Sequence, residues 1–528
     1  MFAKIVSCTL SGVQGIPVDV EACISAGMPY FSIVGLSEGA ARQSRERIRS
    51  AMKSSGFDPP IQKITINLAP TALRKDGASF DLPIALGILL CQSRIPCSFA
   101  QTAMVAGELS LNGELRSIPG VLSMTMCARE RGFNAMILPK CCAAEAALIP
   151  GIKVIGANSL SEVVEYLCGF REIAPAAKPN FIPWTPSCTA LSQIKGQSVA
   201  KRALIAAAAG CHNLLFCGPP GSGKTLLARS LPDLLPPLAF DQALELTQIY
   251  SAAGKLPPDI GLMTRRPFLA PHHTISLHAF TGGGSTPRPG VISLAHRGVL
   301  FMDELPEFSK QCLEALRLPM EDHSVSHQRL HSSVTFPCDF MLVASMNLCP
   351  CGYYPDMSRC TCSQEQVRSY LHRISGPLLD RFDITLPISP IPYDHLQQDA
   401  SPSDLAAAQQ ILTAHEIQRQ RFRKEACLFN SRMTPPLIER YCTVETAGER
   451  LLKTAFSHYS LSIRAYYAIL GVPELWPIWT KVSVSWSAIS ARPFNTTALL
   501  SHSFCTGTHR THVSPISNFT ARLKRAFL

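Results

Sequence analysis

Eight consecutive residues follow the pattern G-x-x-x-x-G-K-[ST]: Gly218, Pro219, Pro220, Gly221, Ser222, Gly223, Lys224 and Thr225. In this pattern, glycines let backbone N–H groups approach phosphate oxygens, the lysine reaches the β- and γ-phosphates, and the threonine hydroxyl ligates Mg²⁺. Residues 212–217 have the apolar pattern of a buried strand, and residues 226–231 open a helix whose N-terminus would face the phosphates. A chance glycine-rich turn lacks this context. The loop therefore predicts binding of ATP or GTP with Mg²⁺.

Two carboxylates, Asp303 and Glu304, end an apolar stretch at residues 299–302. At the carboxyl edge of a sheet, the first can hold the Mg²⁺ shell and the second can polarise the attacking water. A second apolar stretch, residues 340–346, ends at Asn347, whose amide suits orientation of the hydrolytic water. An Asn that caps a turn is the alternative. Downstream of a phosphate-binding loop, these residues predict hydrolysis of the nucleotide.

Arg381 follows an apolar helix end in the stretch 376–383. A planar guanidinium in such a place can be supplied to the γ-phosphate held by a neighbouring subunit. A structural Arg–Asp pair is the alternative.

Four cysteines form a C-x-C-x₈-C-x-C cluster: Cys349, Cys351, Cys360 and Cys362. Four thiolates within fourteen residues can close a tetrahedral Zn²⁺ site. The spacing is tighter than the usual C-x₂-C knuckle. The alternative is a reduced cysteine-rich loop, because the chain holds 20 cysteines in all.

Length and composition set the frame for these motifs. A chain of 528 residues has room for about three domains. The sequence has no apolar run long enough for a membrane span and no signal-peptide pattern, so we expect a cytoplasmic protein with reduced thiols and no membrane partner. A net charge of +11 is compatible with nucleic acid, but a solvated basic surface gives the same surplus.

The composition changes along the chain and predicts five segments. Residues 1–170 alternate strand-like and helix-like stretches, and residues 171–190 hold a proline-rich linker. Residues 191–395 surround the phosphate-binding loop and predict a parallel α/β sheet, and residues 396–470 have a helical pattern. Residues 471–528 keep no period and contain one acidic residue, Glu474.

The ordered motifs resemble an AAA+ ATPase of the magnesium-chelatase and MCM-like branch, most closely its ComM/YifB subfamily. The supporting stretches begin at Gly196, Ala270, Pro289 and Ile374, and the resemblance covers residues 1–470. It implies Walker A at Lys224 and Thr225, Walker B at Asp303 and Glu304, sensor 1 at Asn347, a trans-acting arginine finger at Arg381 and sensor 2 at Arg464. It also implies a hexameric ring that acts on DNA as a branch-migration helicase in recombination and natural transformation.

The N-terminal segment resembles the proteolytic domain of Lon at residues 75–79 and 107–120. Lon-type proteases use a serine that a lysine activates. Ser79 falls at the nucleophile position, but Leu122 stands at the position of the lysine. We therefore expect a Lon-like fold without peptidase activity. The fold class expected overall is α/β: a Lon-like α+β domain, a P-loop AAA+ parallel core and a helical lid.

The tail departs from the subfamily pattern after Leu470. In a shifted reading frame, residues 472–481 can encode A-R-T-M-A-D-M-D-K and residues 488–496 can encode H-I-S-E-A-I-Q-Y, which match the helices that the resemblance calls for. This agreement predicts a single frameshift near Leu470; a divergent natural tail is the alternative. The prolines at 473, 477 and 493 do not suit helix interiors, so the lid would lose its packing partner. We then expect weak or no ATPase activity and poor solubility.

Two other functions fit parts of the pattern. An ATPase subunit of a metal chelatase, which inserts Mg²⁺ into a porphyrin, is disfavoured by the fused Lon-like segment. An ATP-dependent protease is disfavoured by Leu122.

Overall fold

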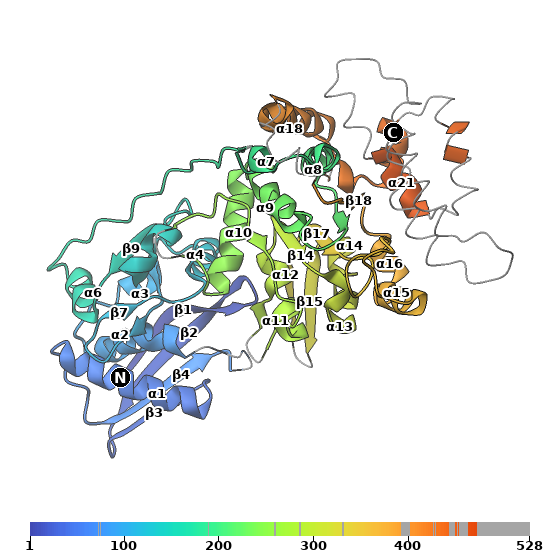
Figure 1. Ribbon diagram of the computed structural model, residues 1–528. Helices are drawn as coiled ribbons and strands as arrows, with labels where there is room; N and C mark the ends of the chain where they lie inside the picture. The colour runs from blue at the N-terminus through green and yellow to red at the C-terminus, as the bar shows by residue number, and fades with distance from the viewer. Residues whose placement is uncertain are drawn as a thin grey trace.

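The computed structural model describes residues 1–471 except residues 72, 74, 76, 188, 258–259, 285–286, 330–331, 392–401, 426, 428, 443–448, 451 and 454–462. The proposed frameshift concerns residues 472–528, which lie outside the described residues. The described chain has an α/β architecture with a β-rich N-terminal module, a five-stranded parallel core and a helical C-terminal region (Figure 1).

The N-terminal module is built on a four-stranded sheet in the order β1-β2-β4-β3. Its strands are β1 (Phe2–Ser11), β2 (Gln14–Ser25), β3 (Tyr30–Val34) and β4 (Lys63–Ala69). The first three in sheet order pair antiparallel, and β3 joins β4 in parallel. Every second side chain of β4 is buried, which gives the strand one apolar face that α1 (Glu38–Ser54) and the almost fully buried α2 (Asp81–Cys91) help to cover.

A second small sheet completes this module. Its parallel strands are β5 (Ala103–Val105), β8 (Ala135–Pro139) and β9 (Lys153–Ala157). The helices beside it are α4 (Val121–Glu130) and α6 (Leu160–Leu167). Ser159 caps α6 by accepting a hydrogen bond from the Glu162 N–H at 3.2 Å.

The core sheet is entirely parallel, in the order β11-β14-β17-β10-β18. Its strands are β10 (Leu214–Cys217), β11 (Phe268–Leu269), β14 (Val299–Met302), β17 (Met341–Met346) and β18 (Ile384–Pro387). The three central strands consist almost wholly of buried apolar residues, because helices and loops cover both faces of the sheet. The parallel sheet expected from the sequence is therefore confirmed.

Helices α8 (Ser198–Gly210), α9 (Lys224–Leu234) and α18 (Pro402–Arg421) pack together on one side of this sheet. The C-terminal region continues with α19 (Pro435–Tyr441) and α21 (Ile463–Gly471), which lie against each other. Within the described ranges, no helix combines the length and apolar character needed to cross a membrane.

Helix α10 (Phe240–Ala252) of the ATPase module docks on α4 of the N-terminal module. Leu122, Leu148 and Ile149 form a buried cluster against which Leu244 of α10 packs. Backbone bonds reinforce this contact, since Gly120 N donates to Ser251 O at 3.0 Å. The two modules therefore share an apolar interface.

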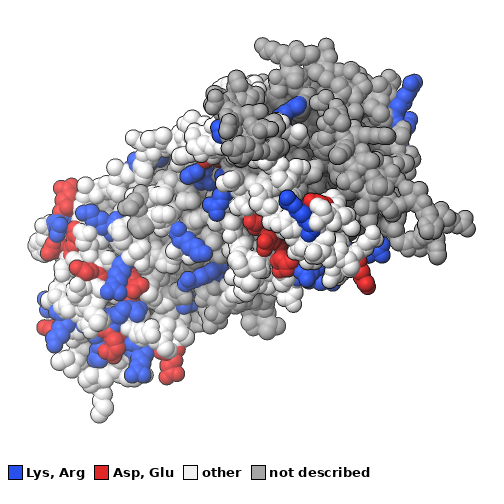
Figure 2. Space-filling model, viewed as in Figure 1, with Lys and Arg blue, Asp and Glu red and all other residues white. Residues whose placement is uncertain are grey.

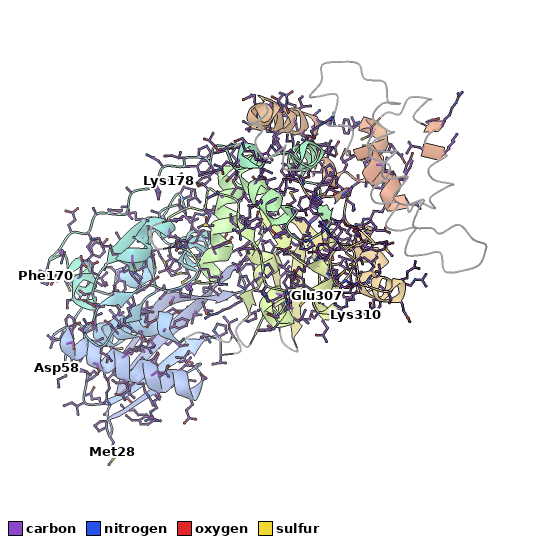
Figure 3. All side chains as sticks on the ribbon, viewed as in Figure 1. Met28, Asp58, Phe170, Lys178, Glu307 and Lys310 are labelled. Carbon is purple, nitrogen blue, oxygen red and sulfur yellow. The ribbon has the colours of Figure 1, made fainter. Side chains whose placement is uncertain are left out.

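The proline-rich segment between the modules is held at several points. Figure 3 labels Phe170 and Lys178, which mark its course along the outside of the molecule toward α10. The Lys178 ammonium lies 5.3 Å from the centroid of the Phe240 ring, and Phe181 packs edge-on against that ring at 5.6 Å.

Candidate active site

The predicted phosphate-binding loop connects β10 to α9 at the carboxyl end of the core sheet. Gly221 and Gly223 have φ angles of +73° and +87°, in the left-handed region that side chains disfavour. A Cβ at Gly218 would lie 2.1 Å from the carbonyl oxygen of Ile388, so the chain requires glycine there. These glycines let the loop curl tightly at the N-terminus of α9, where backbone N–H groups can meet an anion.

Lys224 lies beneath this loop and is buried. Its Nζ donates to Gly218 O at 2.7 Å, to Pro219 O at 2.8 Å and to Asn347 Oδ1 at 3.1 Å. Burial lowers the pKa of Lys224, and the nearby carboxylates of Asp303 and Glu304 oppose that shift. The ammonium and the Asn347 amide thus share one site at the sheet edge.

Thr225 and Asp303 present two oxygens with the spacing of Mg²⁺ ligands. The Thr225 hydroxyl donates to Asp303 Oδ2 at 3.0 Å. An octahedron with Mg–O distances of about 2.1 Å has edges of about 3.0 Å. These two side chains therefore fit neighbouring positions of a Mg²⁺ shell, with phosphate and water oxygens as the other ligands.

Two residues that the sequence analysis missed complete this corner. The Ser345 hydroxyl, on β17, donates to Asp303 Oδ1 and fixes that carboxylate. His273, which follows β11, places Nδ1 3.9 Å from Glu304 Oε2. The sequence signal for His273 is the pair His272-His273, separated by two residues from a short apolar strand. Ser345 gives no such signal, because its contact depends on strand order.

Glu304 is half-exposed and has a left-handed backbone, with φ at +54°. Its backbone N–H donates to Asp303 Oδ1 at 3.2 Å and to the Ser345 hydroxyl at 3.3 Å. The Asp303 carboxylate bonds Thr225 and Ser345, whereas the Glu304 carboxylate lies near His273, so one can serve the metal and the other a water molecule.

Arg381 lies at the opposite end of the core sheet. Asn213 Nδ2, just before β10, donates to Arg381 O at 3.0 Å, whereas the loop begins at Gly218 after β10. The five residues from 213 to 217 span roughly 16 Å of extended chain, and this length separates Arg381 from the phosphate-binding loop. The carboxylate of Asp383 contacts the His212 ring and accepts a hydrogen bond from Asn213 N–H, so it is not the partner of Arg381.

Arg464, on α21, and Arg381 contact the same carboxylate. Glu321 Oε1 accepts from Arg381 Nη2 at 2.6 Å and from Arg464 Nη1 at 2.9 Å. Glu321 belongs to the short α14 (Pro319–Asp322). The structure thus brings these two predicted arginines together, at a place separate from Lys224.

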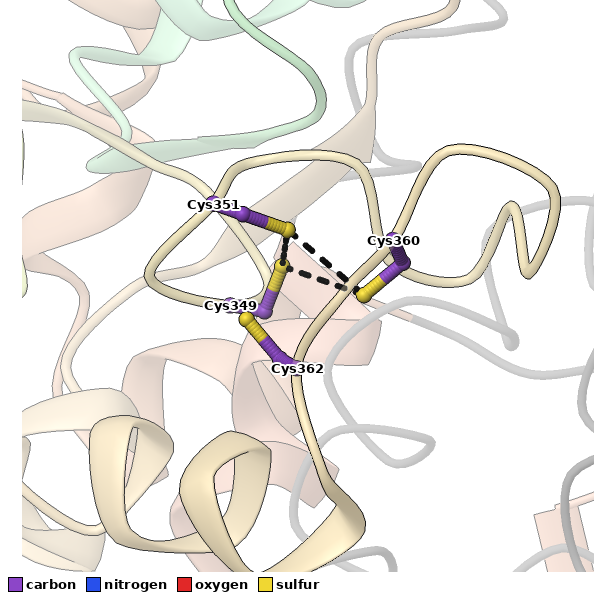
Figure 4. A group of neighbouring side chains, drawn as sticks. All are labelled: Cys349, Cys351, Cys360 and Cys362. Carbon is purple, nitrogen blue, oxygen red and sulfur yellow. Dashed lines mark hydrogen bonds between the residues drawn. The ribbon is translucent and has the colours of Figure 1, made fainter.

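The four clustered cysteines face one another in the loop after β17 (Figure 4). The Sγ of Cys349 lies 3.3 Å from that of Cys351 and 3.8 Å from that of Cys360, and all four sulfurs lie within 4.8 Å of one another. Thiolates about 2.3 Å from a tetrahedral Zn²⁺ are about 3.8 Å apart, so the set fits this metal. A Cβ at Gly352 would lie 2.7 Å from Pro220, so this loop packs on the phosphate-binding loop.

Ser79 lines a cavity of about 360 Å³, together with Arg47 and Glu108 of its own module and Arg288 of the ATPase module. Leu122 is fully buried at the interface with α10. The residue at the expected position of a catalytic lysine is therefore a packing residue.

The core sheet, the loop and the paired carboxylates define a P-loop ATPase of the AAA+ class. Family models for magnesium chelatase match most of the chain: subunit ChlI at residues 190–396, subunit ChlI of Mg-chelatase at 20–141, and the ChlI C-terminal region at 402–473. This chain belongs to that family, among its YifB and ComM homologues.

Three relatives illustrate the similarity. YifB of Salmonella typhimurium is 40% identical over 465 residues, which cover 87% of this chain and 90% of that protein. Competence protein ComM of Haemophilus influenzae is 39% identical over 467 residues, with the same coverage of 87% and 90%. Lon protease 2 of Bacillus subtilis is 30% identical over 126 residues, which cover 24% of this chain and 22% of the protease.

Proposed function

We propose that this chain hydrolyses ATP as a ring-forming motor that acts on DNA, as its resemblance to the ComM type implies. In this proposal Lys224 holds the phosphates, Thr225 and Asp303 hold Mg²⁺, Glu304 polarises the water and Asn347 orients it. Phosphoryl transfer needs positive charge at the γ-phosphate in addition to these groups.

The position of Arg381 is the observation that supports a ring. Its backbone lies at the amino end of β18, across the sheet from the phosphate-binding loop of the same chain. A neighbouring subunit that brings this end of its sheet to the loop would complete the site. Repeating that head-to-tail contact closes a ring, and a hexamer is the number that the resemblance implies.

Support for DNA as the substrate comes from a hairpin of the ATPase module. Strands β15 (Ser324–Arg329) and β16 (Ser332–Pro337) contain His327 but no carboxylate, so the hairpin can approach a phosphate backbone without like-charge repulsion. Elsewhere, Figure 2 shows Lys and Arg mixed with Asp and Glu over the N-terminal module on the face drawn. The hairpin is therefore a better candidate than that face.

The test is ATP turnover by the full chain with no DNA, single-stranded DNA, duplex DNA and branched DNA. We expect stimulation by DNA that weakens steeply with salt, and ATP-driven strand displacement. Lys224→Ala should abolish nucleotide binding, whereas Glu304→Gln should bind ATP without turnover. Wild-type hydrolysis that ignores every DNA form would contradict the proposed substrate.

We also propose that the four cysteines hold Zn²⁺. The ion would supply structural cross-linking of the loop that follows Asn347, since four thiolates leave no open position for a substrate. Its removal would loosen the packing of Gly352 on Pro220.

Two competing functions have direct assays. A chelatase subunit would support ATP-dependent insertion of Mg²⁺ into a porphyrin when partner subunits are added. A protease would cleave casein, and Ser79→Ala would abolish that cleavage. The buried Leu122 gives no support to chelatase or protease activity of the N-terminal module.

A further inference from the structure

The carboxylate of Glu321 joins two parts of the chain that are far apart in sequence. Arg381 precedes the last core strand, and Arg464 belongs to the C-terminal helix α21. Both bind one oxygen, Glu321 Oε1, at 2.6 and 2.9 Å. Figure 1 shows α14, α16 (Gly376–Leu379) and α21 on the same side of the molecule.

The two arginines differ in how tightly they are held. The side chain of Arg381 is 8% exposed, and its Nη1 also donates to Pro377 O at 2.5 Å. Arg464 is 46% exposed, and Glu321 is its ion-pair partner in the described part of the chain. The core therefore fixes Arg381, whereas the position of Arg464 depends on Glu321.

Electrostatics at this point favour separation of the arginines. Burial lowers the pKa of Arg381, and the charges of Arg464 and Arg317 lower it further, while Glu321 opposes them. The hydrogen bond from Arg464 lowers the pKa of Glu321, so the carboxylate stays ionised at neutral pH. One negative charge thus offsets the repulsion between two guanidinium groups.

The buried Nε of Arg381 adds a second observation, because it has no hydrogen-bond partner in the described structure. This nitrogen is enclosed by the protein, so another molecule can meet only the 8% exposed part of the Arg381 side chain.

We infer that Glu321 is a positioning residue that sets Arg381 and Arg464 side by side, so that one subunit presents both to the nucleotide phosphates bound by its neighbour. The inference rests on the proposed ATPase ring. It assigns Arg464 to the same edge as Arg381, and it makes the link between the lid and the core a condition for hydrolysis.

Glu321→Gln keeps the shape of the side chain and removes its charge. In the full chain we expect kcat to fall about tenfold or more, with KM for ATP changed less than about threefold, because nucleotide binding belongs to the loop of the other subunit. Asp322→Asn is the matched control: it removes the neighbouring carboxylate of α14 and should leave both constants unchanged. Thermal unfolding of each variant checks that the fold is intact.

Mixed rings distinguish positioning in trans from a structural role. Glu321→Gln subunits keep a complete loop, and Lys224→Ala subunits keep complete arginines, so mixing the two should restore hydrolysis above the sum of the separate samples. Adding Glu321→Gln to Arg464→Ala should cost little more than Arg464→Ala alone. No restoration on mixing, or additive losses, would overturn the inference.

A readout without turnover separates this inference from the proposed function. Self-association of the full chain with a non-hydrolysable ATP analogue, followed by mass photometry, should weaken in Glu321→Gln, Arg381→Ala and Arg464→Ala alike. Wild-type assembly without hydrolysis would contradict the proposed ATPase only. Assembly of Glu321→Gln that matches the wild type would contradict the role of Glu321.

Discussion

The hydroxyl of Thr225 lies 3.0 Å from Oδ2 of Asp303 and donates a hydrogen bond to it. The two residues follow different strands of the parallel sheet, Thr225 after β10 and Asp303 after β14, and β17 lies between these strands. Strand β17 contributes Ser345, which holds the other carboxylate oxygen of Asp303. The candidate Mg²⁺ site is therefore supported by three strands.

Asp303→Asn should lower ATP hydrolysis by about 100-fold or more, because the amide retains the shape but removes the charge that faces Mg²⁺. The Mg²⁺ concentration needed for half-maximal turnover should be higher for this variant than for the wild type. Glu307→Gln is the control, since Glu307, labelled in Figure 3, lies four residues along and pairs with Arg373 at 2.9 Å. Equal losses in both variants would argue that general folding, and not the metal, is affected.

Removal of Zn²⁺ should destabilise the loop after Asn347. Purified protein should contain one equivalent of Zn²⁺ by elemental analysis, and a chelator should lower both the melting temperature and the affinity for ATP, because the loop packs on Pro220. Cys351→Ser should reproduce both effects. Cys97→Ser, at an exposed cysteine outside the cluster, should change neither. A wild-type protein without zinc that binds ATP with unchanged affinity would refute this role.

The parts of the site that the sequence predicted are those whose chemistry is local. The phosphate-binding loop and the pair Asp303-Glu304 are continuous stretches, and each follows an apolar strand, so a parallel sheet necessarily brings them to one edge. The fold class and the family could be predicted for the same reason. The roles of the individual residues stay predictions.

Contacts that depend on tertiary packing could not be predicted. Glu321 lies 60 residues from Arg381 and 143 from Arg464, and nothing in its local pattern marks it. The sequence marks Leu122 only as the absence of a lysine, whereas its packing near Leu244 of the other module depends on how the two modules dock.

Glu145 offers a pH-dependent test of that docking. It accepts a hydrogen bond from Leu122 N at 3.0 Å and one from the Ser251 hydroxyl of α10. Burial raises the pKa of Glu145 above its ordinary value of 4.5, while these hydrogen bonds oppose the shift. The folded protein therefore holds the proton of the Glu145 carboxyl group more tightly than the unfolded chain does. The free energy of unfolding should fall as pH rises from 4.5 through the raised pKa of Glu145.

Glu145→Gln should remove this loss. As pH rises through that window, the variant should become more stable than the wild type. The difference between their free energies of unfolding should increase by at most about 1.4 kcal/mol per pH unit. Urea unfolding at several pH values measures it, and Glu130→Gln, on the same module, is the control. A difference that is independent of pH would contradict a buried, titrating Glu145.

Restoring the reading frame after Leu470 should restore activity. The ChlI C-terminal family model matches through residue 473, and the alternative frame can encode the helices that the resemblance implies beyond it. In the present frame, Pro473 and Pro477 oppose continuation of a helix just after α21, which carries Arg464. The frame-restored chain should therefore be more soluble than the chain with the present tail and should hydrolyse ATP faster, measured side by side. Resequencing the locus decides the origin of the tail, and an intact frame in a clean trace would eliminate the frameshift. Equal turnover by both chains would contradict the expected loss of activity.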